Sequence, residues 1–377
     1  MKGNYRKLGD YIQPVDVRNS DLKVSHLLGL SIEKCFIESI ANTIGTDFRP
    51  YKIVKKGQFA YGPVTSRNGD KITIALLKEA DVCIISSSYS VFEITDTTKL
   101  LPEYLMLWFS RPEFDRYARY KSHGSVREIF DWDEMCRVEL PVPDLKEQEK
   151  IVNTYNAITK RIQLKQKINE NLEKTAQCLF DELNINKESF EEKTIAEISN
   201  SVICGKTPST AVKEYWGSDI PFITIPDMHG KNFISQTERY LSLKGKSSQE
   251  NQTLPPKSIC VSCIATVGLV SMTITTSQTN QQINSIICKE GISPFYVFLT
   301  LKGMNEELKR LGAGGSTTLN ISKSLFSSIK IKIPNKKEME LFENEISPFF
   351  DSILVNEKEI SKLQKLKQLV ISRISGM

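Results

Sequence analysis

Hydrophobic residues recur in steps of four and three along two long stretches of the chain, both rich in helix-forming residues. Each stretch has ten such positions, eight of them apolar. The first ten are Ile151, Tyr155, Ile158, Ile162, Lys165, Asn169, Leu172, Ala176, Leu179 and Leu183. The second ten are Phe342, Ile346, Phe349, Ile353, Asn356, Ile360, Leu363, Lys367, Val370 and Ile374. This spacing is typical of coiled coils, so it predicts two long helices that each need a partner.

The two stretches belong to a longer repeat, because the last third of the chain aligns with the middle at one constant displacement, 334 − 143 = 191. Tyr104-Leu105-Met106 falls on Phe295-Tyr296-Val297, and Val142-Pro143-Asp144 falls on Ile333-Pro334-Asn335. Few residues are identical, but apolar positions meet apolar positions and turns meet turns. A period this long indicates two whole domains rather than a solenoid. We therefore expect a molecule with pseudo-twofold symmetry.

The two helices are expected to pair with each other in antiparallel orientation and to hold the two domains at opposite ends of a rod. A helix of about 40 residues spans about 60 Å. The alternative is that each apolar seam packs on its own domain. The polar seam residues Lys165, Asn169 and Asn356 either fix the register, at some cost in stability, or face solvent. Pro348 either kinks the second helix or sets its effective start.

The rest of each half alternates between strand-like runs and turns. In the first half, β-branched and aromatic residues predict strands at 52–54, 58–61, 71–76, 82–86, 91–94 and 138–143, and a helix at 102–120. In the second half, strands are predicted at 222–225, 259–264, 285–288 and 329–333. Between the short openings at 8–12 and 194–198 and the shared helix, the two halves look unrelated. The predicted fold class is α/β (α+β), with globular domains at 1–143 and 191–334 and long helices at 144–190 and 335–377.

Composition narrows the class of protein only a little. The net charge of +5 permits an anionic partner without requiring one. No apolar run approaches the roughly 20 residues that a membrane-spanning helix needs. The eight cysteines are scattered through apolar sequence, which is typical of reduced thiols. We expect a soluble protein of the cytoplasm with no membrane partner.

No sequence pattern indicates a catalytic site. Gly205-Lys206-Thr207 is similar to the end of a phosphate-binding loop, but Asn200 occupies the place of its first glycine. Cys260 and Cys263 form a lone pair in an apolar run, which favours a buried strand over a zinc site. The three histidines are far apart in sequence. We expect a chain that is not an enzyme and that holds no metal or cofactor of its own.

Several motifs together resemble the specificity subunits of type I restriction–modification systems. Leu140-Pro141-Val142-Pro143 leads through Glu149 into a seam helix, and this arrangement occurs twice. The second half adds four further motifs, which are Gly205-Lys206-Thr207-Pro208-Ser209, Asp219-Ile220-Pro221-Phe222-Ile223, Ala265-Thr266-Val267-Gly268 and Thr279-Asn280-Gln281-Gln282. The first half is similar to a different recognition-domain type of the same family. The resemblance covers nearly the whole chain.

The resemblance implies a non-catalytic reader of double-stranded DNA. Each globular domain would be a target-recognition domain for one of two half-sites, and the helix pair would fix the gap between them. Two modification subunits that use S-adenosylmethionine would methylate adenines. Restriction subunits that use ATP and magnesium would complete a nuclease.

Polar side chains on loops are the candidates for base reading, because Asn and Gln can bond adenine while Arg and Lys can bond guanine. The DNA-binding candidates are Arg67, Asn68, Lys121, Ser122, His123, Ser125, Arg127, Thr207, Ser209, Lys231, Thr266, Asn280, Gln281, Gln282, Ser316 and Thr317. His123 either contacts a phosphate or is a solvated loop residue. Tyr215 and Trp216 are expected in the core rather than stacked on bases.

Two other functions remain open from the sequence. A coiled-coil scaffold with two end domains would show no sequence-selective DNA footprint with any partner. A fragment of a fused modification–restriction enzyme would transfer methyl groups by itself, which the missing cofactor motifs argue against.

Overall fold

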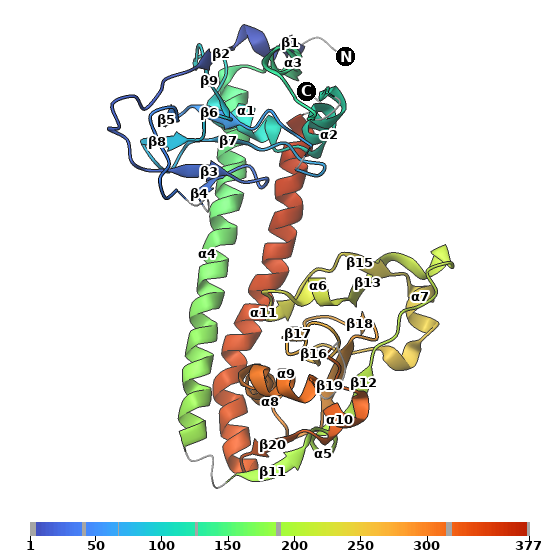
Figure 1. The fold of residues 1–377 in the computed structure, drawn as a ribbon. Coiled ribbons are helices and arrows are strands. Elements are labelled where there is room, and N and C mark those ends of the chain that lie inside the picture. Colours follow the sequence, from blue (N-terminus) through green and yellow to red (C-terminus); the bar gives the residue numbers. More distant parts are fainter. Residues whose placement is uncertain are drawn as a thin grey trace. The chain divides into compact units, whose positions relative to one another are not determined.

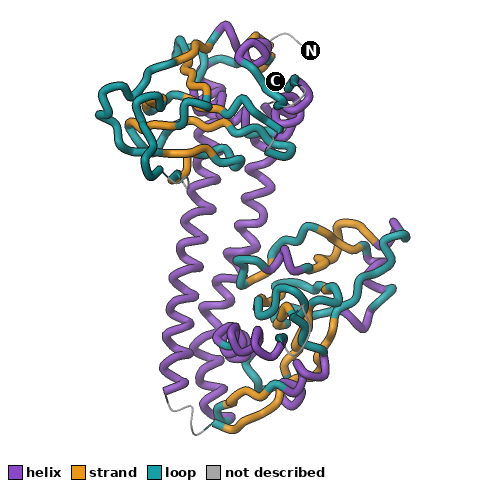
Figure 2. Tube along the Cα trace, in the orientation of Figure 1, coloured by secondary structure: helices purple, strands orange, loops and turns teal. Residues whose placement is uncertain are grey.

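The computed structural model describes residues 5–39, 43–66, 68–124, 127–185, 190–313 and 319–374. The chain divides into two compact units. Unit 1 is Met1–Arg161 with Gln364–Met377, and unit 2 is Ile162–Leu363. Both units take part of each long helix, α4 (Leu145–Leu183) and α11 (Lys336–Arg373), which are continuous in Figure 2. The domain boundaries expected from the sequence stay predictions.

Unit 1 is built on a four-stranded antiparallel sheet in the order β2-β9-β6-β7 (Figure 1). Three strand pairs, β1–β10, β3–β4 and β5–β8, surround it. The strands are β1 (Tyr5–Lys7), β2 (Ile12–Val15), β3 (Leu28–Leu30), β4 (Phe36–Glu38), β5 (Lys52–Lys55), β6 (Phe59–Tyr61), β7 (Ile74–Leu76), β8 (Val82–Ile85), β9 (Ser90–Ile94) and β10 (Glu139–Pro141). The helices before α4 are η1 (Leu8–Asp10), α1 (Pro102–Phe109), α2 (Pro112–Lys121) and α3 (Trp132–Arg137).

Unit 2 contains a five-stranded sheet in the order β12-β19-β16-β17-β14, a three-stranded sheet β15-β13-β18 and the pair β11–β20. The strands are β11 (Glu191–Thr194), β12 (Ser199–Cys204), β13 (Trp216–Ile223), β14 (Phe233–Ile234), β15 (Arg239–Leu241), β16 (Ile259–Ser262), β17 (Val270–Thr273), β18 (Gln278–Thr279), β19 (Ile283–Cys288) and β20 (Lys330–Ile333). The helices are α5 (Ile195–Ile198), η3 (Lys213–Tyr215), α6 (Ile225–Met228), α7 (Leu243–Ser247), η4 (Glu250–Gln252), α8 (Pro294–Gly303), α9 (Asn305–Gly312) and α10 (Lys323–Ser328).

The internal repeat is confirmed at the level of single elements. Adding 191 to the bounds of α3 gives 323 and 328, which are the bounds of α10, and adding 191 to Leu145 gives the first residue of α11. The strand order β2-β9-β6-β7 of unit 1 also recurs as β12-β19-β16-β17 in unit 2. The two halves therefore share a sheet order, as the repeat predicted, although their sequences between the openings and the shared helix look unrelated.

One predicted helix is interrupted. The sequence predicted a single helix at 102–120, but α1 ends at Phe109 and α2 begins at Pro112. Proline lacks the N–H that continues a helix but suits its first turn, so Pro112 ends one helix and starts the next. A second proline, Pro348, lies inside α11. Pro348 therefore does not set the start of α11, which begins at Lys336.

Within each unit, the segments of α4 and α11 pair in antiparallel orientation, as predicted. In unit 1 the ammonium of Lys367 lies 4.8 Å from the centre of the Tyr155 ring. In unit 2 the rings of Phe180 and Phe342 are 6.3 Å apart. Also in unit 2, Lys165 of α4 contacts Asn356 of α11, so within this unit the partner number on α11 falls as the number on α4 rises. All twenty seam positions are buried or half-buried.

The polar seam residues form a hydrogen-bonded layer between the helices of unit 2. Lys165 Nζ donates to Asn356 Oδ1 at 2.8 Å, and Asn356 Nδ2 donates to Asn169 Oδ1 at 2.8 Å. Asn169 Nδ2 then donates to Glu357 Oε1 at 2.9 Å. Burial raises the pKa of the Glu357 carboxyl, while hydrogen bonds from Asn169 and Ser235 and the charge of Lys231 oppose the rise. The solvent-facing alternative for these seam residues is therefore excluded.

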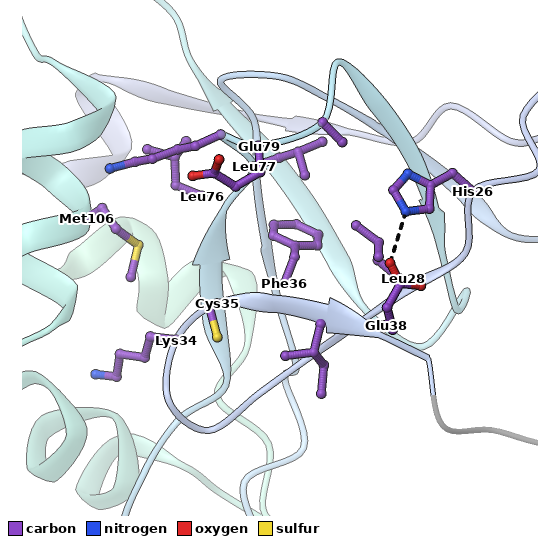
Figure 3. A pocket seen from close by; sticks show the side chains of 13 residues that line it. His26, Leu28, Lys34, Cys35, Phe36, Glu38, Leu76, Leu77, Glu79 and Met106 are labelled. Atoms are coloured by element: carbon purple, nitrogen blue, oxygen red, sulfur yellow. Dashed lines mark hydrogen bonds and ion pairs between the residues drawn. The ribbon is translucent and has the colours of Figure 1, made fainter. Parts of the chain in front are cut away.

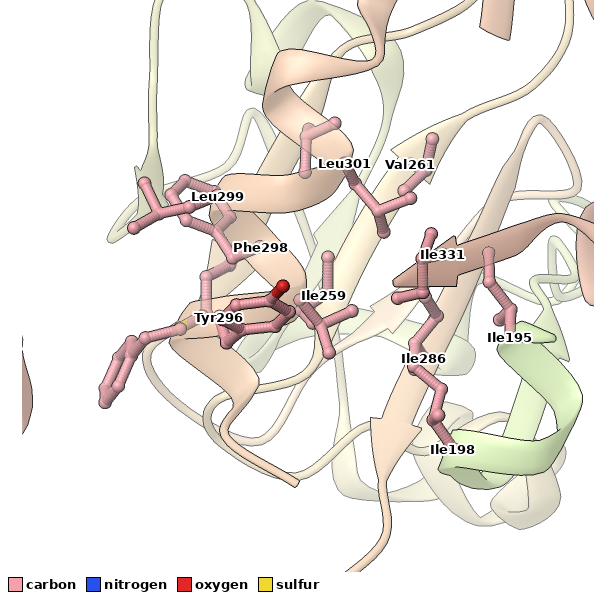
Figure 4. Close-up of a cluster of buried hydrophobic side chains, with 14 of the residues drawn as sticks. Ile195, Ile198, Ile259, Val261, Ile286, Tyr296, Phe298, Leu299, Leu301 and Ile331 are labelled. Atoms are coloured by element: carbon pink, nitrogen blue, oxygen red, sulfur yellow. The ribbon is translucent and has the colours of Figure 1, made fainter. Parts of the chain in front are cut away.

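The core of unit 2 joins the globular domain to both helices. Figure 4 shows part of it, with Ile259 of the sheet beside Tyr296 of α8, and Ile286 near Ile198 and Ile331. Ala176 and Phe180 of α4 and several apolar residues of α11 belong to the same buried cluster. The core of unit 1 likewise includes Ile151 and Val152 of α4 and Ile374 of the C-terminal segment.

Candidate nucleic-acid interface

All five strands of the main sheet in unit 2 have one end at the same side of the sheet, and the predicted polar residues lie near these ends. Cys204 at the end of β12 pairs with Asn284 near the start of β19, and Ser262 at the end of β16 pairs with Ile283. β17 and β14 both begin at this edge, because β17 is antiparallel to β16 and parallel to β14. The loops that carry Thr207, Thr266, Gln281 and Lys231 therefore leave the same side of the sheet. We call this side the unit 2 edge.

A close backbone approach holds two of these loops together. The amide N–H of Gly205 donates to Ile283 O at 3.1 Å, and that of Lys206 donates to Thr279 O at 3.0 Å. A Cβ added at Gly205 would lie 2.2 Å from Thr279 Oγ1 and 2.3 Å from Asn280 O. Only glycine fits at this position, so the sequence motif that begins at Gly205 has a packing reason.

Thr207 and Gln281 meet across this contact. Thr207 Oγ1 donates to Gln281 Oε1 at 2.8 Å, although 74 positions separate the two residues. Gln281 is exposed and Thr207 is half-buried. The neighbouring amides are used inside the turn, since Asn280 Nδ2 donates to Gln282 Oε1 at 3.0 Å and Gln282 N donates to Asn280 Oδ1 at 3.1 Å. The structure thus separates an outward amide from two that shape the turn.

The other candidates of unit 2 lie around this pair. Thr266 is exposed in the β16–β17 loop, and exposed Lys231 precedes β14. Ser209 is exposed, and its carbonyl accepts a hydrogen bond from Trp216 Nε1 at 3.4 Å. Ser316 and Thr317 lie outside the described residues.

Sequence reasoning missed two lysines and misjudged two aromatic residues, Tyr215 and Trp216. Lys206 and Lys323 are exposed. Lys206 follows β12 at the unit 2 edge, and the charge of Lys323 lowers the pKa of the Cys204 thiol, opposing the larger rise that burial causes. Trp216 is half-buried rather than in the core, as is Tyr215. The guanidinium of Arg239 lies 3.5 Å from the centre of the Trp216 ring, which is a cation–π contact. Lys206 lies inside the Gly205-Lys206-Thr207-Pro208-Ser209 motif, so a signal was present there, whereas no motif marked Lys323.

In unit 1 the candidates gather at the side of the sheet where β6 ends and β7 begins. Asn68 Nδ2 donates to Thr73 Oγ1 at 2.8 Å and to Val64 O at 3.3 Å. Ser122 Oγ donates to Ala118 O at 2.7 Å and accepts from Thr65 Oγ1 at 2.8 Å. Asn68 and Ser122 therefore hold loops in place rather than face a ligand.

His123, Arg127 and Lys121 differ in exposure. His123 and Arg127 are exposed, whereas Lys121 is half-buried with Nζ 4.0 Å from Glu134 Oε2. Arg127 lines a pocket of about 390 Å³ together with Asn68, Thr73, Ser88 and Tyr89. We call this the unit 1 groove. Arg67 and Ser125 lie outside the described residues.

A second pocket in unit 1 contains none of the predicted residues. It has a volume of about 490 Å³ and lies between β3, β4 and the residues that follow β7 (Figure 3). His26 and Glu38 face each other at its rim, 3.5 Å apart. Lys34 lines the pocket and forms an ion pair with Asp115 at 2.8 Å, while burial lowers the pKa of its ammonium.

The described part of the chain holds no group of three or more His, Cys, Asp or Glu residues arranged to bind a metal ion. Cys260 lies in β16 and Cys263 directly follows it, and both are buried, as the apolar run predicted. Burial raises the pKa of the Cys260 thiol to about 12 and that of Cys263 to about 11. Among the described residues, no helix is apolar and long enough to span a membrane.

Comparison with known proteins gives a consistent result. The sequence profile described as "Type I restriction modification DNA specificity domain" matches residues 38–174 and 187–369. The chain is 31% identical to the type I restriction enzyme HindI specificity subunit of Haemophilus influenzae, over 86% of each protein. It is 32% identical to the MjaIX specificity subunit of Methanocaldococcus jannaschii, over 49% of this chain and 43% of that protein.

A solved structure shares the fold. The crystal structure of the S subunit of a type I restriction–modification system from M. genitalium matches with a TM-score of 0.61 and 13% sequence identity. The match covers 98% of this chain and 95% of the other. At this identity, the likeness speaks for the fold alone.

Proposed function

We propose that this chain, which belongs to the specificity subunits of type I restriction–modification systems, reads a bipartite DNA target. The target would consist of two half-sites separated by a fixed gap. One observation supports this most directly. Two sheets of the same strand order each present polar loops at one edge, and a repeated helix follows each sheet. A duplicated reader suits a target with two similar parts.

In this proposal, unit 1 reads one half-site through Arg127, which lines the unit 1 groove, and through His123, and both residues are exposed. Unit 2 reads the other through the unit 2 edge, with Thr207, Ser209, Lys231, Thr266 and Gln281. The exposed lysines supply attraction to phosphates, which carries most non-specific affinity. Asn68, Ser122, Asn280 and Gln282 act as supports of the loops.

Catalysis is assigned to other polypeptides. Two modification subunits with S-adenosylmethionine would methylate adenines in the half-sites, and restriction subunits with ATP and magnesium would complete the nuclease. The chain itself would be a non-catalytic reader that acts in the cytoplasm, where prokaryotic DNA lies. The paired helices α4 and α11 would set the distance between the readers.

The test is to co-express the full chain with the modification subunit of its own system in a host without adenine methylation, and to map methylated adenines across the genome. A bipartite motif that appears only when both proteins are present is expected. Methylation without this chain, or no motif with both proteins, would contradict the proposal. The scaffold alternative predicts the second of these outcomes.

A length change tests the spacing role separately. Seven residues inserted in each helix, after Arg161 and after Ile360, keep the four-three seam and add about 10 Å, or about three base pairs, to the pair. We expect the same half-sites with a gap longer by about three base pairs. The matched control inserts seven residues in α4 alone, which misaligns the seams and should abolish methylation. An unchanged gap in the double insertion would contradict the spacing role.

A further inference from the structure

We propose that Gln281, held in place by Thr207, is the side chain with which unit 2 recognises an adenine·thymine pair at its major-groove edge. This inference rests on the proposed function and names a residue and a base for it. The observation that carries it is the hydrogen bond from Thr207 Oγ1 to the exposed Gln281 amide, at 2.8 Å.

The free bonding capacity of Gln281 matches adenine. With Thr207 as donor, one lone pair of Gln281 Oε1 and both hydrogens of Nε2 remain for a ligand. A glutamine amide can accept from adenine N6 and donate to adenine N7 at the same time. Guanine presents two acceptors at this edge, so it leaves the second lone pair of Gln281 Oε1 without a donor.

The turn that carries Gln281 offers a single outward amide. Asn280 is 9% exposed, and its Nδ2 donates a hydrogen bond to Gln282 Oε1. The backbone carbonyl of Gln282 accepts from Cys263 N at 2.8 Å. The two flanking amides are therefore committed to the shape of the turn. Gln282 is half-buried, so Gln281 is the only exposed residue of the run 279–282.

Buried amides fix both loops from behind. Gln249 Nε2 donates hydrogen bonds to Lys206 O and to Gln278 Oε1, both at 2.8 Å. Gln278 Nε2 in turn donates to the backbone carbonyl of Gln249 at 3.2 Å. Gln249 is 6% exposed and Gln278 is fully buried. A side chain that is already ordered loses less entropy on binding, so this support favours recognition by Gln281.

Charge on the same edge suits a DNA backbone. Lys206 directly precedes Thr207 and Lys323 lies near Cys204 at the end of β12, and both are exposed. Phosphate contacts fix position without carrying sequence information. This separates the roles: the lysines would place the edge in the groove, and Gln281 would read one base.

The experiment maps methylation motifs with the full chain and its modification subunit, for the unaltered chain and for Gln281→Ala and Gln281→Glu. In Gln281→Ala we expect the preference for adenine at one position of one half-site to fall by about 10- to 100-fold. In Gln281→Glu we expect that position to change toward cytosine, because a carboxylate accepts from cytosine N4 and cannot donate to adenine N7. The half-site read by unit 1 should stay the same in both, which also reports that the variants fold.

A pair of Thr207 variants and one Lys206 variant separate base reading from other roles. Thr207→Val should weaken the preference at the same position and Thr207→Ser should restore it, because only the hydroxyl orients Gln281. Lys206→Gln should lower methylation at all sequences alike and leave the motif intact.

A wild-type motif in both Gln281 variants, or a uniform loss like that of Lys206→Gln, would overturn the assignment and leave the proposed function standing. No motif with the unaltered chain would overturn both.

Discussion

The two units fasten their long helices by different means at equivalent positions. In unit 1, Gln148 is fully buried and makes three hydrogen bonds, accepting from Leu101 N at 2.9 Å and donating to Lys99 O and Pro143 O at 2.8 Å. The equivalent residue of unit 2 is Met339 (148 + 191 = 339), which is 2% exposed and apolar. One joint is polar and directional, and the other is hydrophobic.

The aromatic residues show the same contrast. In unit 2 the ring of Phe350 stacks on Phe295 with their centres 4.1 Å apart. Its equivalent in unit 1 is Thr159 (350 − 191 = 159), whose buried hydroxyl has no hydrogen-bond partner among the described residues. A shared frame therefore tolerates an aromatic stack in one unit and a buried hydroxyl without a described partner in the other.

The largest expected effect comes from the stack of Phe350 on Phe295 in unit 2. Phe350→Ala removes a ring that is 1% exposed, and we expect a loss of about 3–5 kcal/mol in the free energy of unfolding. Urea denaturation measures the loss, and hydrogen exchange of β16 and β19 should place it in unit 2. Phe349→Ala is the control, because its ring is only half-buried and should cost less. Equal costs for the two variants would contradict this account.

A smaller effect is expected from the polar joint. Gln148→Met copies unit 2 and leaves the Leu101 N–H without its partner, so we expect a loss of about 2 kcal/mol. The reverse change, Met339→Gln, places an amide in an apolar site and should also destabilise. Both are measured by urea denaturation. If Gln148→Met were as stable as the unaltered chain, the joint would depend on packing alone.

The smallest effect concerns pH. Glu357 has the equivalent Gln166 in unit 1 (357 − 191 = 166), so Glu357→Gln makes the two repeats alike at this position. Burial raises the folded-state pKa of Glu357 above 4.5, so between the unfolded-state and folded-state pKa values the folded chain binds more protons than the unfolded chain. The stability of the folded state therefore falls as the pH rises from 4.5 through the folded-state pKa. The amide does not ionise, so its advantage should appear near pH 7 and shrink near pH 4, as measured by urea denaturation at both values. A variant that is less stable at pH 7 would refute this.

Local patterns along the chain were enough for the two long helices, several strands and the repeat. The four-three seam predicted α4 and α11, and β-branched runs predicted β5, β8, β16 and β20, whereas α3 and its equivalent α10 had no prediction. The break at Pro112 was missed although the signal was present, since a proline ends one helix and starts another. The candidate residues of the unit 2 edge could be chosen by type and loop position, but not ranked.

The ranking came from contacts between residues distant in sequence. Thr207 and Gln281 meet because β12 and β19 are neighbours in the sheet, and nothing near either residue encodes that pairing. The two-residue strand β14 also depends on a distant partner, β17. The same holds for the hydrogen bonds that join Lys165 and Asn169 to Asn356. Sequence by itself determined the periodic elements, because hydrophobic period and turn chemistry act over a few residues. Only the tertiary structure decided which polar groups are satisfied and which face outward, because strand register and helix pairing are fixed by the burial of the whole core.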